Sequence, residues 1–157
     1  MQALNHTLEK NLVEADGRYL TTQELQPLEQ YVENYAVCLA AYQQLRDNSE
    51  KLVIQALRRF ATTYPELIQQ HSGRCKYDMS EVLRYTALCI LRNDEILFRE
   101  QVVAWLDTIL LAHKRHSQCV VAYRYLEAII AQVFPEATSA VIRPYLEIVI
   151  QALESHA

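Results

Sequence analysis

The amino-acid sequence predicts a single all-α domain. Its 157 residues include only two glycines and four prolines, so the tight turns that join β-strands are scarce. Apolar residues make up 51% and charged residues 22%, which is ordinary for a globular protein large enough to bury a core. Apolar side chains recur every three or four residues along most of the chain, as they do on one face of an α-helix. No repeat or linker interrupts residues 1–157, so we expect one domain.

The first predicted helix, residues 3–14, is short, and Asp16-Gly17 is the signal that ends it. A helix of this length is marginal alone and has little core of its own. Three leucines share one of its faces at four-residue spacing: Leu4, Leu8 and Leu12.

A capping box formed by Thr21 and Glu24 begins the next predicted helix, which runs to about Arg46. Asp47-Asn48-Ser49 is predicted to end this helix and to cap another one. Tyr64-Pro65 is then predicted to break the chain before a short turn and a loop.

The predicted loop covers residues 69–74, and a helix is expected from about Lys76 to Leu91, where Asn93-Asp94 ends it. Three more helices are predicted after that point. A basic corner at residues 113–116 and the pair Phe134-Pro135 separate them.

Four cysteines are present, and no Cys-x-x-Cys spacing indicates zinc or a redox dithiol. Three lie in apolar stretches and are expected to be core residues: Cys38, Cys89 and Cys119. Cys75 is different, because Arg74 and Lys76 flank it and because it opens the expected helix. Both features favour the thiolate.

Cys75 and Asp78 lie about one helical turn apart, on one helix face. The thiol can fix a ligand covalently, while the carboxylate accepts hydrogen bonds from N–H groups of that ligand. A conjugated tetrapyrrole offers a vinyl-type carbon for the first contact and pyrrole nitrogens for the second. A Cys and an Asp at this spacing are, taken alone, more often structural.

The stretch from Cys75 and Asp78 to Leu83-Arg84 resembles the chromophore-attachment helix of phycobiliproteins, the antenna proteins of phycobilisomes, in an allophycocyanin-like form. Four other stretches are similar to that family: Gly17-Arg18-Tyr19-Leu20, residues 24–32, residues 64–68 and residues 144–147. The resemblance covers nearly the whole chain. It implies a globin-like helical domain with an N-terminal helical extension.

The resemblance also implies a cofactor, a bilin, which is a linear tetrapyrrole similar to phycocyanobilin. Cys75 would form the thioether and Asp78 would hold the central pyrrole nitrogens. Tyr77 stands where the family has an arginine that pairs with a bilin propionate, so Arg74 or Lys76 is expected to take that role.

Two further departures indicate a diverged relative with a thinned pocket. Glu81 and Val82 stand where the family has two tyrosines, and the loop at residues 69–74 is shorter than the loop that walls the chromophore in the family.

Assembly into a homo- or hetero-oligomer with phycobiliprotein-like chains is implied as well. Residues 1–16 would form an oligomerisation helix whose leucines contact another chain. The polar part of this interface would comprise Arg18, Tyr19 and Arg84, with Glu14 or Asp16 as ion-pair partners.

The net charge of −4, without a long basic run, argues against nucleic acid as a partner. No run of eighteen apolar residues is long enough to span a bilayer, and the start of the chain lacks a signal-peptide pattern. We therefore expect a cytoplasmic protein, on the cytoplasmic face of thylakoids if the resemblance extends to location.

The spacing of His113, His116 and Cys119 suggests metal or haem ligation, but the helix corner favours a basic turn followed by a core cysteine. No Ser/His/Asp set, phosphate loop or paired acidic motif is present, so we expect no enzyme.

Two functions stay open. The first is a bilin-binding protein for light absorption or bilin handling, linked to phycobilisomes. The alternative is a bilin-free interaction module that acts in phycobilisome or photosystem assembly, disassembly or regulation; Tyr77, Glu81 and Val82 favour it. A haem-sensing globin would require an axial ligand.

Overall fold

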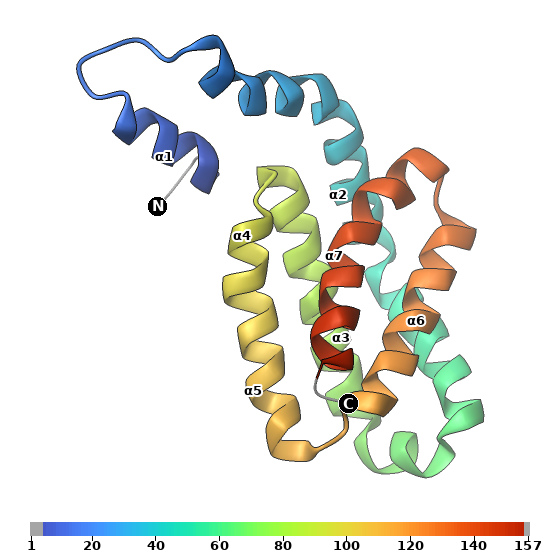
Figure 1. Ribbon diagram of the computed structural model, residues 1–157. Helices are drawn as coiled ribbons and strands as arrows, with labels where there is room; N and C mark the ends of the chain where they lie inside the picture. Colours follow the sequence, from blue (N-terminus) through green and yellow to red (C-terminus); the bar gives the residue numbers. More distant parts are fainter. Residues whose placement is uncertain (1–4, 156–157) are drawn as a thin grey trace.

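The computed structural model describes residues 5–155, except for the side chains of residues 110–113. Every regular element in this range is helical, which confirms the all-α prediction (Figure 1). In order they are α1 His6–Glu14, α2 Thr22–Thr63, α3 Pro65–Arg92, α4 Glu95–Phe98, the π-helical η1 Arg99–Val103, α5 Ala104–His113, α6 His116–Val133 and α7 Glu136–Glu154. None of the described helices is both long and apolar enough to cross a lipid bilayer.

The helices form two regions (Figure 1). The body comprises α3 to α7 together with α2 from Cys38 onward, and within it α2 packs on α3, α6 and α7. The N-terminal arm, residues 5–37, projects from one end of this body and folds back through α1. Cys38 is the first residue of α2 that is buried.

α2 is one unbroken helix of 42 residues, so the predicted end at Asp47-Asn48-Ser49 is wrong. Asp47 is exposed, Asn48 and Ser49 are half-buried, and Asn48 Nδ2 donates to the Gln44 carbonyl at 2.9 Å. On the inner side, Leu45 and Leu52 are buried. Burial of the inner face therefore overrides the weak helix propensity of the outer one. The predicted capping box of Thr21 and Glu24 is confirmed.

α3 is also continuous, and the loop predicted at residues 69–74 is wrong. Pro65 begins the helix, where its missing N–H costs nothing. Leu67 and Ile68 pack against the core within this first turn, so the helix has an apolar anchor before Gly73. The predicted break at Tyr64-Pro65 and the end at Asn93, whose φ of 51° is left-handed, are both confirmed.

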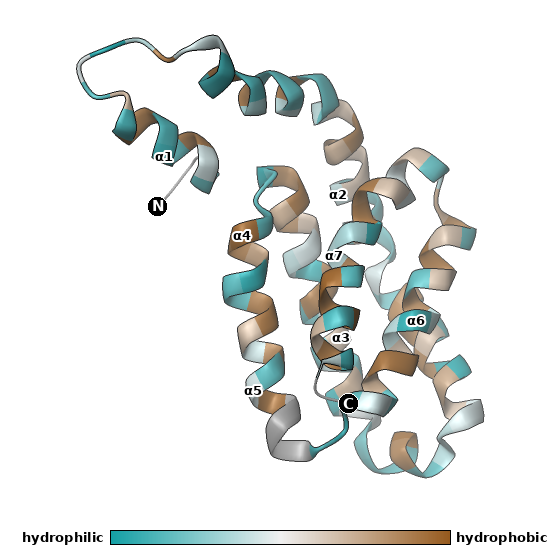
Figure 2. Ribbon diagram, viewed as in Figure 1, coloured by the Kyte–Doolittle hydropathy of each residue, from teal (hydrophilic) through white to brown (hydrophobic). Residues whose placement is uncertain are grey.

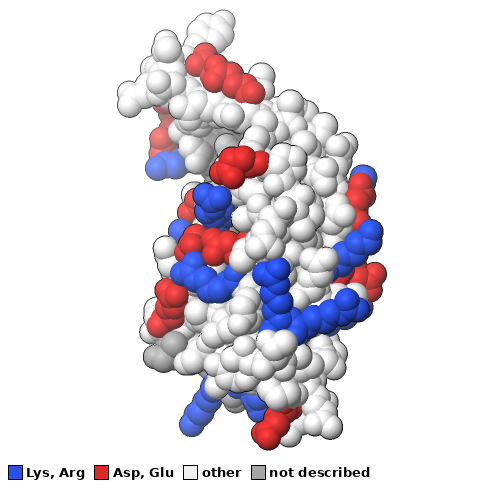
Figure 3. All heavy atoms as spheres, turned by 90° about the vertical axis from the view of Figure 1, so that its right-hand side faces the viewer, with Lys and Arg blue, Asp and Glu red and all other residues white. Residues whose placement is uncertain are grey.

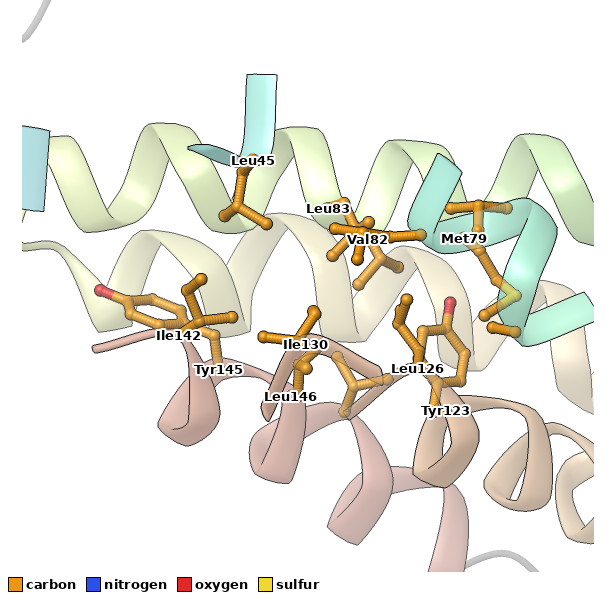
Figure 4. Packing of buried hydrophobic residues seen from close by; sticks show 14 of the residues in the cluster. Leu45, Met79, Val82, Leu83, Tyr123, Leu126, Ile130, Ile142, Tyr145 and Leu146 are labelled. Carbon is orange, nitrogen blue, oxygen red and sulfur yellow. The ribbon is translucent and has the colours of Figure 1, made fainter. Parts of the chain in front are cut away.

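The core lies where α2 and α3 meet α6 and α7 (Figure 4). Leu83 of α3 and Leu126 of α6 are fully buried there. The rings of Phe98 and Tyr145 pack edge to face, with their centres 5.1 Å apart. Cys38 and Cys89 are buried core residues, as predicted. Figure 2 shows apolar segments concentrated in the body, with polar residues prominent at the connections.

Polar contacts fasten the arm to the body. His6 Nδ1 lies 3.1 Å from both oxygens of the Asp94 carboxylate, which also caps the N-terminus of α4. The hydroxyl of Tyr31 donates to the carbonyl of Leu91 at the end of α3. The arm nevertheless leaves large apolar side chains exposed, by 43–97%: Leu12, Val13, Tyr19, Val32 and Tyr35.

Candidate ligand pocket beside Cys75

A pocket opens between one face of α3 and the first half of α6. Its cavity volume is about 90 Å³, and the total empty space between its walls, open solvent included, is about 750 Å³. Apolar side chains from α2, α3, α5 and α6 make up most of its wall: Leu57, Phe60, Leu67, Met79, Leu106, Ile109 and Ala122. The polar groups in the wall are His71, Arg74, Cys75, Asp78, Arg115, Gln118, Cys119 and Tyr123.

Two helix faces carry these polar groups. His71, Cys75 and Asp78 recur at three- and four-residue spacing on α3. Arg115, at the start of α6, and Cys119 and Tyr123 within it recur at four-residue spacing. The two rows face each other across the pocket. Figure 4 shows part of this juxtaposition, where Tyr123 of α6 lies beside Met79 of α3.

Cys75 is half-buried and lies inside α3, well past the first turn of that helix. Burial raises the pKa of its thiol, the neighbouring Asp78 carboxylate raises it further, and Arg115 opposes both. The prediction of a thiolate-favouring environment is therefore wrong. The positive end of a helix acts only over its first turn, which Cys75 does not occupy.

Asp78 is mostly buried, and Arg74 binds it from the preceding turn. Arg74 Nε donates to Asp78 Oδ2 at 3.0 Å, and the exposed fractions of the two side chains are 51% and 13%. The guanidinium of Arg74 also lies 5.8 Å from the centre of the Tyr77 ring. A carboxylate held next to a thiol can accept N–H donors from a ligand in this pocket.

The wall contributed by α6 was not predicted as a site. Cys119, expected in the core, lines the pocket, and burial raises the pKa of its thiol to about 12. Tyr123 is only 3% exposed, and its hydroxyl makes no hydrogen bond with the described residues. Burial raises the pKa of this hydroxyl well above its usual range. The four-residue spacing from Arg115 to Tyr123 was the available signal.

The other residues predicted to contact a bilin lie away from the pocket. Lys76 Nζ binds Glu50 at 2.8 Å and lines a separate open groove between α2 and α3, with Arg58 also in its wall. Tyr77 is 56% exposed and is absent from the pocket wall. Of the two residues expected to replace the family's arginine, Arg74 and Lys76, the structure places only Arg74 in the wall of the Cys75 pocket.

The predicted interface residues have other partners or remain exposed. Within the single chain Arg18 binds Glu24, at 2.9 and 2.8 Å, so its ion pairing across a subunit interface stays a prediction. Arg84 binds Glu81 at 2.6 Å, while Tyr19 is 97% exposed.

The three leucines of the expected oligomerisation helix differ from one another. Leu8 is 7% exposed in the single chain, so its own chain covers it, contrary to the expectation that it faces another chain. Leu12 is 46% exposed. Leu4 lies outside the described residues.

The histidine corner does not form a metal cluster within the described residues. His116 is buried, with Nε2 4.0 Å from Asp107 Oδ1, while Cys119 faces the pocket. The side chain of His113 lies outside the described part of the chain.

Fold and pocket together define a helical domain with a thiol and a carboxylate on the wall of an apolar ligand pocket. Comparison with protein families matches residues 11–153 to the family described as "Phycobilisome protein". The chain therefore belongs to the phycobilisome protein family, whose phycobiliproteins are light-harvesting proteins with a globin-like all-α fold. No curated protein matches the chain. Family membership confirms the resemblance and supports a phycobiliprotein-like role.

Proposed function

We propose that this protein binds a bilin at Cys75, for light absorption or bilin handling linked to phycobilisomes and without turnover chemistry. The observation that carries the proposal is the pairing of Cys75 and Asp78 on the wall of one pocket, in a family that generally carries bilins. Cys75 would add across a carbon–carbon double bond, so that sulfur bonds one carbon and the thiol hydrogen ends on its neighbour. Nothing is released, and the protein gains the full mass of the ligand.

Asp78 supports the same proposal because its carboxylate can accept the pyrrole N–H groups. Tyr123 offers a buried hydroxyl on the opposite wall, which can donate to a polar atom of the ligand. Met79, Phe60 and the other apolar side chains would cover the flat faces of the conjugated rings.

The size of the pocket limits how a bilin would lie. Enclosed sites for small molecules measure roughly 300–1,000 Å³. The cavity here has a volume of about 90 Å³, below that range, and fits only part of a tetrapyrrole. Most of the bilin would therefore lie across the mouth, next to solvent. A chromophore held this loosely loses excitation by twisting, which favours bilin handling over efficient energy transfer.

Co-expression with a bilin-producing pathway tests the proposal. We expect a red-shifted visible band and an intact mass raised by one bilin. Both should vanish in Cys75→Ala and persist in Cys119→Ala, the matched control from the opposite wall of the pocket. A wild-type protein without visible colour and with unmodified mass would refute bilin attachment.

The second candidate function is a bilin-free interaction module, and the arm favours it. Five large apolar residues of the arm are exposed, including Tyr19 and Val32, and Figure 3 shows uncharged surface between acidic side chains at that end of the molecule. Such a surface is typical of a protein–protein contact. The arm, with Leu12, Arg18 and Tyr19, would dock on phycobiliprotein-like chains, or on phycobilisome or photosystem proteins at the cytoplasmic face of thylakoids.

Sedimentation velocity over a range of concentrations tests the arm as an interface between copies. We expect self-association that Val32→Asp weakens at least about tenfold, which corresponds to about 1.4 kcal/mol. Val133→Asp is the matched control, because Val133 is similarly exposed but lies at the end of α6, in the body. Equal sedimentation of wild type and Val32→Asp would contradict an interface at this residue.

A further inference from the structure

The charges around the pocket are unequal. Two guanidinium groups, Arg74 and Arg115, line it together with the imidazole of His71, whereas Asp78 is the only carboxylate among the described residues of its wall. The two guanidinium groups come from different elements, α3 and the start of α6. The mouth of the pocket therefore favours an anionic ligand.

Arg74 and Arg115 differ in what already binds them. Arg74 donates to Asp78 at 3.0 Å, so the carboxylate largely offsets its charge. Arg115 makes no side-chain hydrogen bond or ion pair with any described residue, although it is half-buried at the pocket. Its positive charge opposes the rise in the pKa of Cys119, on the same helix face, and of Cys75, on the opposite wall of the pocket.

A guanidinium presents N–H donors in a planar fork that matches the two oxygens of a carboxylate. A bilin carries two carboxylates on its propionate side chains. Lys76, one of the two residues expected at a propionate, binds Glu50 outside the pocket, and Arg74, the other, already donates its Nε to Asp78. Arg115 is the guanidinium in the pocket wall that donates to none of the described residues.

We propose that Arg115 binds a carboxylate of the ligand and makes the pocket selective for acids over their neutral esters. The sequence predicts a basic corner at residues 113–116, but the start of α6 places Arg115 on the same helix face as Cys119 and Tyr123. The inference rests on the proposed bilin function and adds to it the residue that recognises the acid.

The test compares biliverdin with biliverdin dimethyl ester, which differ only in the charge and size of the two acid groups. Binding to the full chain is followed by quenching of the single tryptophan, Trp105, which lies in α5 next to the pocket residue Leu106. In a Cys75→Ala background, covalent attachment cannot mask the affinity. We expect this protein to bind the acid on the order of tenfold more tightly than the ester.

Arg115→Gln should abolish this preference, and Arg115→Lys should keep part of it, because it retains the charge but not the fork. Arg58→Gln is the matched control: it removes a guanidinium from the groove between α2 and α3 and should keep the full preference. Unchanged circular dichroism melting establishes that each variant is folded. Binding of both compounds with equal acid preference in Arg115→Gln would overturn the role of Arg115 alone. Binding of neither compound would overturn the bilin function and this inference with it.

Discussion

In the arm, Leu8 and Ala15 are the buried apolar residues among those described, whereas from Cys38 onward nearly every turn of α2 buries one. The arm is held instead by polar contacts, such as His6 with Asp94 and Arg18 with Glu24. The same helix, α2, passes through both regions. The comparison teaches that helix continuity and burial are separate matters here: the body buries a core of its own, whereas apolar side chains of the arm stay exposed in the single chain.

The largest effect is expected from removing a core side chain in the body. Leu83 is fully buried, so Leu83→Ala should lower the free energy of unfolding by about 2–5 kcal/mol. Val32→Ala in the arm removes a side chain that is 65% exposed and should change it by less than about 0.5 kcal/mol. Urea denaturation of the isolated chain at low concentration measures both. Equal losses would show that the arm and the body do not differ as described.

The next largest effect on stability is expected at the junction between the arm and the body. Asp94 has a side chain 1% exposed and accepts from His6, from Arg92 and from the Leu97 N–H. Asp94→Asn keeps the shape but loses the charge, and should cost about 1–3 kcal/mol near neutral pH.

The pH dependence of this cost follows from the pKa of Asp94. Burial raises that pKa, but the Leu97 N–H and His6 lower it more, so it lies below its ordinary value. The stabilisation is therefore present above the unfolded pKa, about 4, and is lost as pH falls through the folded one. Urea denaturation between pH 3 and 7 should show wild type and Asp94→Asn converging at low pH. A constant difference would contradict this account.

The two thiols of the pocket provide a chemical test of burial in the body, because burial raises their pKa values and so slows their reaction with alkylating reagents. The raised pKa of Cys75 should make its alkylation by iodoacetamide slow at pH 7 and faster by about tenfold for each pH unit below that pKa. Arg115→Gln should slow it further, since Arg115 favours the thiolate. Peptide mass spectrometry follows each cysteine, and Cys119, whose pKa is about 12, serves as the slower control. A rate independent of pH between 7 and 9 would contradict the assignment.

The smallest effect is expected at the start of α2, in the arm. The Arg18 guanidinium and the Thr21 N–H lower the pKa of Glu24 to about 2, so this carboxylate keeps its partners until strongly acid pH. Glu24→Ala should leave the global unfolding midpoint unchanged. It should speed hydrogen exchange of the first amides of α2, because the side chain that accepts from the Thr21 N–H is lost and the capping box with it. Exchange rates equal to those of wild type would show that the cap does not hold this turn.

Local signals predicted the parts of the fold that depend on neighbouring residues. The capping box at Thr21, the break before Pro65 and the left-handed end at Asn93 are of this kind. The uninterrupted course of α2 and α3 was missed because packing of their inner faces outweighs the polar and flexible residues on the outside.

The candidate site shows the same division. Cys75 and Asp78 share one helix and were found from their spacing. Arg115, Cys119 and Tyr123 belong to α6, far along the chain, and their proximity to Cys75 depends on how the helices pack. The protonation state of Cys75 was mispredicted for the same reason, since burial acts only once the walls are assembled.

The 42 residues of α2 have a mechanical consequence. At about 1.5 Å per residue the helix is about 63 Å long, and it carries Tyr31 and Val32 near one end and the pocket residues Leu57 and Phe60 near the other. α2 joins the two ends as one continuous helix, which bends between the arm and the body (Figure 1). If the proposed docking surface binds a partner, a tilt of the arm would be transmitted along this helix to two walls of the pocket. The proposed docking and the proposed ligand binding would then be coupled through α2.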